Sequence, residues 1–407
     1  MNQPHPPTAS GKSPRWVRGS ALLTASALLA LGASVAPAAP ALAASATVSS
    51  AGALAGALGA AVPGDTVTLG SDIDVTPVDT AIAITAAGVT LDLAGHTLTT
   101  QSAVSVPGIG VPSGTALTIR DSDGRGVLEA GGGESAPGIG AVAGAGAITI
   151  SGGTITANGG AWGAGIGGGS DGNGATVTIS GGTVTAQGAS FAAGIGGGSG
   201  GDGGTTTITG GSVTARGMLS GAGIGGGFGG DGGVTTISGG TVFATSGPGF
   251  GTTGRQGAAI GGGGGQPATA IRPATGPGAG ANLVIGSGAN VTLTSGEFGG
   301  PAIGSGGPGS SAFGTFSNAG TLTLTPRVRF AIPGGITVEN SGTIINDGVA
   351  TNHGVLRNAG SVVNNATFAN PGVITSGGTV TSTGTAITGQ LLVLVVWGVL
   401  GGGGGVG

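Results

Sequence analysis

The sequence predicts an all-β protein: a right-handed parallel β-helix, or β-solenoid, with a short N-terminal capping helix and a C-terminal hexad-type solenoid section. Three observations support this fold class: a 29-residue repeat, an alternation of apolar with polar residues inside each repeat, and glycine pairs between the alternating segments. A fixed period of this size is typical of stacked supersecondary units. The period also changes the meaning of 100 glycines in 407 residues, which without it would indicate disorder.

The repeat is clearest in three near-copies of one unit, whose period is marked by Ile166, Ile195 and Ile224. They read GAGIGGGSDGNGATVTISGGTVTA from Gly163, AAGIGGGSGGDGGTTTITGGSVTA from Ala192 and GAGIGGGFGGDGGVTTISGGTVFA from Gly221. In the first copy we expect strands at residues 164–167, 176–180 and 183–186. The alternation of a strand turns one set of apolar side chains inward: Ile166, Val177, Ile179 and Val184. Threonines alternate with these, and glycine pairs allow tight corners.

Two columns of apolar residues extend the repeat beyond these copies. One column occupies the strand centres: Leu91, Ile119, Ile150, Ile179, Ile208 and Ile237. The other lies between small residues: Ile109, Ile139, Ile166, Ile195, Ile224, Ile260 and Ile303. We expect the members of each column to stack on one another in successive coils. The late steps of the second column are longer because loops are inserted within residues 243–260 and 261–282, the second being a flexible excursion.

The N-terminus carries the features of a secretory signal peptide over residues 1–43. A basic region comes first, with Lys12, Arg15 and Arg18. An uncharged apolar region follows at residues 21–35, and residues 41–43 match an A-x-A cleavage site. A retained membrane anchor is the alternative. We therefore expect a secreted or cell-surface protein, with a mature chain beginning near Ala44.

Composition narrows the classes of partner and site. The net charge is −4, and it becomes −7 without the three cations of the signal peptide, which argues against a nucleic-acid partner. The chain has no cysteine, so disulfides and thiolate metal sites are excluded.

A short helix is expected to close the N-terminal end of the β-helix. Leu54, Leu58 and Val62 fall on one face of a helix at i, i+4 and i+8. Ser50 is the expected N-cap. A helix at this place would cover apolar residues and backbone groups that an open stack of strands exposes. The β-helix with coils of about 29 residues is expected to span residues 44–310.

A second repeat is expected within residues 311–390. Asparagine recurs at every sixth position: Asn340, Asn346, Asn352, Asn358, Asn364 and Asn370. Four positions after each asparagine comes one apolar residue: Ile344, Ala350, Leu356, Val362, Phe368 and Ile374. This rhythm predicts a narrower solenoid section that continues the stack, with asparagine side chains hydrogen-bonded to one another along a ladder.

The last residues, 391–407, form an apolar, glycine-rich tail. Its apolar run, Leu391 to Leu400, is shorter than the ~20 residues that a membrane-spanning helix needs. A final strand or cap is the favoured interpretation. A truncated or aberrant end and a membrane-associating tail are the alternatives.

Several of these motifs resemble a known group of proteins. VTLDLAGHTLT at residues 89–99 and ALTIRDSDGRGVLEA at residues 116–130 are similar to the first coils of secreted bacterial right-handed β-helix surface proteins, a pectate-lyase-like repeat family. The GAGIGGG…TVTISGGTVTA units are similar to the repeats of the same group. The resemblance covers residues 51–307. It implies a right-handed β-helix in a cell-surface context and, for some members, carbohydrate binding.

Candidate catalytic and metal-binding groups are few, and we predict no catalytic, cofactor or metal site. Asp202 and Asp231 lie in G-G-x-G-x-D turns, but these turns recur once per coil rather than in the tandem nine-residue repeats of a calcium site. The D-x-D-G turn at residues 121–124 lacks the other ligands of a calcium loop. Solvated turns are therefore favoured over ion sites.

The densest charged set comprises Asp92, Asp121, Asp123, Glu129, Arg120 and Arg125. Asp92 and Arg120 are separated by close to one repeat, so we expect them to be neighbours on adjacent coils. A structural ion pair is favoured over a lyase site, which would need carboxylates and a base on one face. His96 and His353 are the histidines of the mature chain, and neither has a carboxylate at a repeat-equivalent position.

An aromatic pair is the favoured ligand-binding feature. Trp162 and Phe191 are separated by one full repeat and precede their strands by the same offset, so we expect them to stack on adjacent coils. Such a pair offers a platform for the apolar faces of sugar rings. Packing within the loops is the favoured interpretation of this pair, and the sugar-binding platform is the alternative.

The outward threonines invite an ice-binding interpretation as well. Thr-x-Thr recurs in neighbouring copies, as at Thr176/Thr178 and Thr205/Thr207. The columns are interrupted by other residues: Ala147, Val234, Ser212 and Phe243. Threonine is also a good strand residue, which weakens this interpretation.

The function predicted from the sequence is that of a secreted or cell-surface structural, adhesin-like β-helix protein. Polysaccharide or cell-wall glycan is the expected partner, bound through Trp162 and Phe191. The alternative is a polysaccharide-degrading enzyme of lyase type on the same fold.

Overall fold

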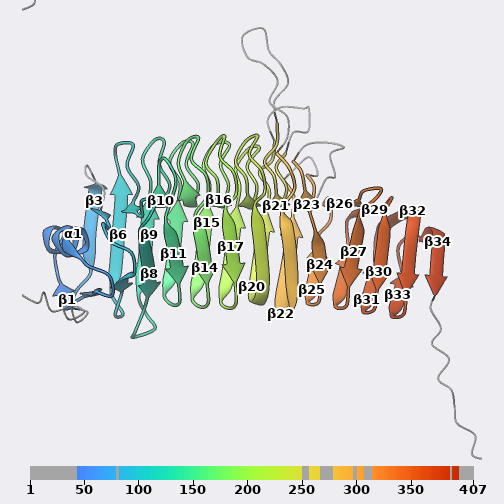
Figure 1. Ribbon diagram of the computed structural model, residues 1–407, viewed down its shortest axis with the longest axis horizontal. Helices are drawn as coiled ribbons and strands as arrows, with labels where there is room; N and C mark the ends of the chain where they lie inside the picture. The colour runs from blue at the N-terminus through green and yellow to red at the C-terminus, as the bar shows by residue number, and fades with distance from the viewer. Residues whose placement is uncertain are drawn as a thin grey trace, which may run out of the picture. The chain divides into compact units, whose positions relative to one another are not determined.

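The chain winds as a right-handed parallel β-helix, which confirms the predicted fold class (Figure 1). The computed structural model describes residues 44–78, 82–249, 256–265, 278–296, 300–306, 314–385 and 387–393, which belong to one compact unit. The predicted signal peptide lies outside the described residues, as do residues 394–407 of the tail and residues 250–255 and 266–277 of the two inserted loops.

Each coil contributes strands to three faces, and equivalent strands of successive coils pair in parallel. Face 1 contains β1 (Ser45–Val48), β2 (Thr66–Leu69), β5 (Val89–Asp92), β8 (Ala116–Arg120), β11 (Ala147–Ile150), β14 (Thr176–Ile179), β17 (Thr205–Ile208), β24 (Phe316–Asn318), β27 (Thr337–Asn340) and β30 (Val355–Asn358). Longer strands turn a corner and contribute to two faces: β20 (Val234–Thr245), β22 (Asn282–Thr294), β32 (Thr367–Ser376) and β34 (Thr388–Val393).

Face 2 follows face 1 across a tight corner. It contains β3 (Ile73–Val78), β6 (Thr97–Ser102), β9 (Val127–Gly131), β12 (Thr154–Asn158), β15 (Thr183–Gln187), β18 (Ser212–Arg216), β25 (Thr321–Leu324), β28 (Thr343–Asn346), β31 (Ser361–Asn364) and β33 (Thr379–Ser382). Face 3 consists of short strands: β4 (Ile82–Ala83), β7 (Ile109–Gly110), β10 (Ile139–Ala141), β13 (Ile166–Gly168), β16 (Ile195–Gly196), β19 (Ile224–Gly225), β21 (Ile260–Gly261) and β23 (Ile303–Gly304). In the narrower coils it continues with β26 (Arg329–Ile332) and β29 (Val349–Asn352).

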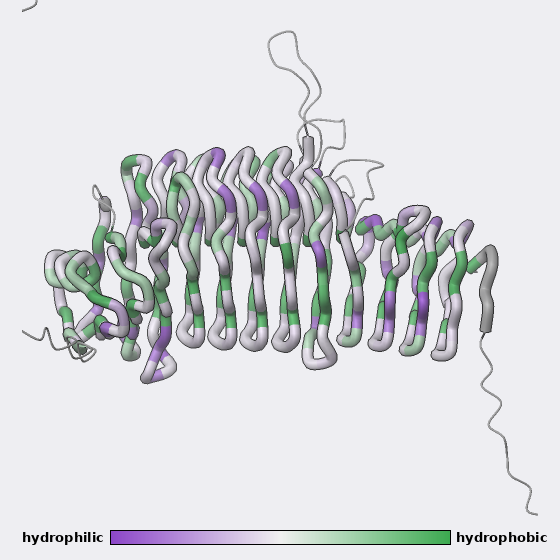
Figure 2. Tube along the Cα trace, in the orientation of Figure 1, coloured by the Kyte–Doolittle hydropathy of each residue, from purple (hydrophilic) through white to green (hydrophobic). Residues whose placement is uncertain are grey.

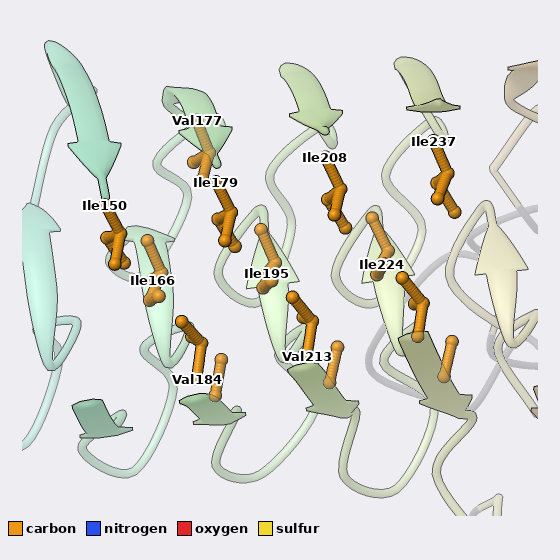
Figure 3. Close-up of a cluster of buried hydrophobic side chains, with 14 of the residues drawn as sticks. Ile150, Ile166, Val177, Ile179, Val184, Ile195, Ile208, Val213, Ile224 and Ile237 are labelled. Carbon is orange, nitrogen blue, oxygen red and sulfur yellow. The ribbon is translucent and has the colours of Figure 1, made fainter. Parts of the chain in front are cut away.

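Both predicted apolar columns are in register, coil by coil. Leu91 pairs with Ile119, and the column continues without a shift to Ile237. The column of face 3 does the same from Ile109 to Ile303. The side chains of the two columns point into one shared interior (Figure 3), and apolar residues recur at the same level in successive coils (Figure 2). Full burial of each isoleucine contributes about 2 kcal/mol to the stack.

The predicted strands of the first clean copy have slightly different bounds in the structure. The face 3 strand begins at Ile166 rather than at residue 164, and residues 164 and 165 lie in the irregular segment before it. The four residues predicted to point inward, including Val184, are buried, with exposures of 0–1%.

From Ile139 to Ile303, the glycine after each isoleucine of the face 3 column adopts a conformation that other residues rarely reach. Gly196 has φ +134°, and a Cβ there would overlap the carbonyl oxygen of Gly225 in the next coil. Gly167 and Gly225 repeat this arrangement with φ +136° and +134°. The short face 3 strands therefore stack at a backbone distance that excludes any side chain at these positions.

The N-terminal helix α1 (Ala51–Ala60) is present, and the Ser50 hydroxyl caps it by accepting from the backbone N–H of Ala53. Leu54 and Leu58 are fully buried in the core. The prediction for Val62 was wrong: the helix ends before it, and its side chain is 45% exposed. The turn that leads through Pro63 into β2 carries Val62 away from the helix axis.

Equivalent asparagines of the narrower section are 18 residues apart, and two successive coils have one such asparagine on every face. Asn340 pairs with Asn358 on face 1, Asn346 with Asn364 on face 2, and Asn352 donates to Asn370 on face 3. The side-chain N–H of one asparagine reaches the side-chain oxygen of the next at 2.7–2.8 Å in all three ladders. This confirms the predicted asparagine ladders, and all six apolar residues of the hexads are buried between them.

Candidate binding surfaces

Asp92 and Arg120 face each other on β5 and β8, in register as expected. The Arg120 Nε lies 3.0 Å from the Asp92 Oδ2, and the Asp92 side chain is only 3% exposed. The same carboxylate accepts from the backbone N–H groups of Ala94 and Ser122 at 3.1 and 3.0 Å. Asp92 therefore holds two turns and a guanidinium together, as a structural ion pair does.

The neighbouring turn is tied together in the same manner. Asp121 accepts from the backbone N–H groups of Gly95 at 2.8 Å and Gly126 at 2.6 Å. Asp123 pairs with Arg125, and this hydrogen bond, followed by the charge of the carboxylate, raises the pKa of the guanidinium. The oxygens of this D-x-D-G turn thus bond the turn itself and the turn of the preceding coil. Within the described residues no group of three His, Asp or Glu side chains could hold a metal ion.

One histidine lies near a carboxylate of the adjacent coil, although this carboxylate is not at the equivalent position of the repeat. Asp72 precedes β3, and its carboxylate lies 3.5 Å from the His96 Nδ1 and accepts from the backbone N–H of Thr97 at 2.8 Å. His96 therefore does have a carboxylate on the adjacent coil. The Asp72 side chain is 76% exposed, so the pair lies at the surface of the first coils rather than in a cleft.

The glycine-rich turns contain a ladder of their own. The Asn173 side-chain oxygen accepts from the backbone N–H of Asp202, and the Asp202 carboxylate accepts from that of Asp231, at 3.0 and 2.8 Å. The Asp231 carboxylate accepts from Ala279 at 2.6 Å. Each of these side chains joins its turn to the equivalent position in the next coil, which gives the repeated aspartate a structural role.

Trp162 and Phe191 occupy equivalent positions in adjacent coils, before β13 and β16. The Trp162 side chain is 39% exposed. The Phe191 ring contacts the Phe228 ring of the next coil edge to face, with centroids 5.4 Å apart. The backbone oxygens of Trp162 and Phe191 accept from Ser199 and Phe228 respectively. Phe191 is therefore engaged in loop packing, and Trp162 presents the exposed aromatic surface of this edge.

A groove of about 690 Å³ lies where the wide coils give way to the narrow ones. It follows two outward columns of face 1 along the solenoid axis. The first column runs in register from β22 to β32 through Val284, Ser317, Glu339, Arg357 and Thr375. The second, at the corner of the same coils, consists of Gly286, Ala319, Ser341, Ala359 and Gly377.

The groove combines an apolar end with a polar centre. Val284 is 44% exposed at the β22 end. Near the centre, the Arg357 guanidinium bonds the Glu339 carboxylate at 3.0 Å, and both side chains are more than half exposed. Sequence reasoning missed this site. Its nearest signal was the place where the long repeat gives way to the hexad repeat.

Comparison with known proteins bears on the fold. A family model described as "Beta helix repeat" matches residues 148–170, 177–199, 207–228 and 236–264. No curated protein and no solved structure matches the chain. By its fold the chain is thus a β-helix repeat protein. In the part of the chain that is described, no helix has the length and apolar character to cross a membrane.

Proposed function

We propose that this protein is a secreted or cell-surface, adhesin-like scaffold that binds a polysaccharide in the groove across β22, β24, β27, β30 and β32. The groove itself is the observation that carries this proposal. It is elongated along the solenoid axis and open to solvent. The middle of a long polymer can therefore bind from the side, without a chain end entering first. The signal-peptide features of residues 1–43 and the resemblance to pectate-lyase-like surface proteins support the extracellular setting.

The side chains of the groove suit sugar hydroxyls. Arg357 supplies several N–H donors and Glu339 two acceptor oxygens, fixed relative to each other by their own hydrogen bond. Ser317, Ser341 and Thr375 add hydroxyl groups along the same columns. Ligand sites of this kind combine an apolar surface with a few well-placed polar groups.

Preorganisation supports a binding role. Every strand that lines the groove is paired on both sides within face 1, and the asparagine ladder of face 1 lies directly beneath it. Little ordering of the protein is then needed when a ligand binds, which favours affinity. Trp162 offers a second contact on the wide coils, where an exposed indole can pack against a sugar ring.

The test is a glycan array with the secreted chain, followed by titration calorimetry with oligosaccharides of the best polymer. Arg357→Ala should weaken binding by about tenfold, since it removes the central donor. Arg125→Ala is the matched control, because Arg125 is also an exposed, ion-paired arginine but lies outside the groove. The affinity of Arg125→Ala for the oligosaccharide should stay within about twofold of the native affinity.

Three outcomes would contradict the proposal. They are no binding to any glycan, equal losses of affinity in the two arginine variants, or enzymatic cleavage of the polysaccharide. Turnover would appear as unsaturated uronide released from an acidic polysaccharide, and it would favour the lyase alternative. Trp162→Ala tests the second contact separately: Trp162 lies between β12 and β13, away from the face 1 groove, so this variant should leave the binding of short oligosaccharides in the groove unchanged.

A further inference from the structure

One outward column of face 1 contains threonine in seven consecutive coils. It runs in register through β2, β5, β8, β11, β14, β17 and β20: Thr66, Thr90, Thr118, Thr149, Thr178, Thr207 and Thr236. Each of these threonines is partly exposed. Figure 1 shows β14, β17 and β20 side by side on this face. The interruptions expected from the sequence fall in other columns.

A second column of hydroxyl groups lies two positions further along the same coils. Its exposed members are Ser151, Ser180, Thr209 and Ser238. Their backbone N–H groups continue the pairing of face 1, as in the bond from Ser180 to the Ile150 oxygen at 2.9 Å. Together the two columns form a hydroxyl array on four coils, from β11 to β20, that contains no charged and no aromatic residue.

Strand propensity does not explain the array. Valine, isoleucine and aromatic residues serve an outward strand position as well as threonine does. The column two positions earlier on the same strands varies freely, with Ala116, Ala147, Thr176, Thr205 and Val234. The outward columns of face 2 also vary, and include Glu129 and Phe243. The constant threonine is thus a property of one column.

The geometry of the array gives it a regular period. Paired strands lie about 4.8 Å apart, so the threonine hydroxyls repeat at that spacing along the solenoid axis. This repeat is close to the distance between second-neighbour oxygen atoms in hexagonal ice. Threonine is stiff at χ1, so each hydroxyl and methyl group keeps one orientation. A hydroxyl group both donates and accepts, as a water molecule does.

We infer that this hydroxyl array binds ordered water and, through it, the surface of ice. The absence of charge within the array favours a neutral lattice over an ionic ligand. The absence of aromatic side chains from it favours ice over a crystalline polysaccharide, whose sugar rings pack on aromatic rings. This function is independent of the proposed glycan groove, which begins beyond β20 on the same face.

The experiment measures inhibition of ice recrystallisation and thermal hysteresis with the full secreted chain. The native protein should inhibit recrystallisation at micromolar concentration. Thr178→Lys places a long charged side chain at the centre of the array and should raise the required concentration by about tenfold. Thr185→Lys is the matched control: Thr185 has similar exposure in the same coil, stacks between Thr156 and Thr214, and lies on face 2.

The concentration of the control variant that inhibits recrystallisation should stay within about twofold of that of the native chain. Circular dichroism and thermal melting verify that both variants fold, and Thr207→Lys replaces Thr178→Lys if that variant does not. The inference is overturned if the native chain inhibits recrystallisation no more than serum albumin does. It is also overturned if Thr178→Lys on face 1 and Thr185→Lys on face 2 reduce the inhibition equally. Binding to insoluble chitin or cellulose that Thr178→Lys abolishes, without any effect on ice, would also overturn it and assign the array to a polysaccharide.

Discussion

The wide coils and the narrow coils fill their interiors and join successive coils with different residues. In the wide coils, from β5 to β20, isoleucine columns fill the interior, and glycine lets the backbones of face 3 approach closely. In the narrow coils, from β24 to β33, one apolar residue per face fills a smaller interior, and buried asparagines join successive coils through their side chains. The wide section therefore depends on backbone proximity, and the narrow section on side-chain hydrogen bonds.

This difference explains where the groove lies. The cross-section shrinks between β22 and β27, where the shorter coils of the asparagine section begin. The turn inside β22 also has one residue more than the turn inside β20, since Ile237 and Ile285 are paired but Gly239 pairs with Gly288. The groove thus lies at the place where the size of the coils changes.

The largest expected effect tests the role of glycine in the wide coils. Gly196→Ala should lower the free energy of unfolding by about 3 kcal/mol or more, because a side chain there meets the Gly225 carbonyl and the backbone has φ +134°. Denaturant unfolding measures the change. Gly56→Ala is the control: an added Cβ in α1 has no atom within 4 Å, and the substitution should stabilise by up to about 1 kcal/mol. Equal effects at the two sites would contradict the close-approach argument.

The second prediction concerns the asparagine ladders of the narrow coils. Asn358 is 2% exposed, accepts from Asn340 and donates to the Ser376 hydroxyl and the Thr379 carbonyl. Asn358→Ala should lower the free energy of unfolding by about 2–3 kcal/mol, because it leaves the buried hydrogen-bond partners of Asn358 unsatisfied.

Asn365→Ala is the matched control for the ladder, since Asn365 is exposed and bonds only at the surface to Asp347 and Thr383. Its effect on the free energy of unfolding should stay below about 0.5 kcal/mol. If the two asparagine variants melt alike, the ladder contributes nothing beyond strand pairing.

Much of the fold was predictable because the β-helix repeats its constraints. Each Ile of a column faces the same environment, so the spacing of the repeat alone predicts the register from Leu91 to Ile237. The asparagine ladders were predictable for the same reason. The strand β1 before the helix was missed, because it occurs once and has no repeat to reveal it.

The candidate sites were harder to predict than the fold. The groove arises from a difference between neighbouring coils, and a periodic pattern carries no information about such a difference. The pairing of Phe191 with Phe228 was missed because it joins non-equivalent positions of adjacent coils, whereas the repeat relates equivalent ones. The continuous threonine column became visible only when the strand pairing aligned the first coils, which differ in length, with the regular ones.

The third prediction concerns a polar residue in the apolar interior of the wide coils. Thr206 is 2% exposed at an inward position between Val177 and Thr235. Thr206→Val should raise the free energy of unfolding by about 1 kcal/mol, because it replaces a buried hydroxyl with a methyl group. Thr207→Val, at the next and outward position, should change stability by less than about 0.5 kcal/mol. A loss of stability in Thr206→Val would show that the hydroxyl has a partner in the interior.

The smallest expected effect lies at the N-terminal end of the wide coils. The Asp65 carboxylate accepts from the backbone N–H groups of Val62 and Ala44 at 2.9 and 2.8 Å, and these bonds, Val62 first, hold its pKa below the ordinary value. Because the pKa is lower in the folded state, the carboxylate stabilises the fold above the unfolded pKa of about 3.9, and this contribution is lost as the pH falls through the folded pKa.

Asp65→Asn should therefore melt slightly below the native chain near neutral pH, and the difference should shrink as the pH falls below about 4. Thermal melting of both proteins across this range measures it. A difference that stays constant into strong acid would mean that the carboxylate acts through packing rather than charge. In that case the junction between α1 and β2 would depend on shape, as the glycine contacts of the wide coils do, rather than on hydrogen bonds, as the ladders of the narrow coils do.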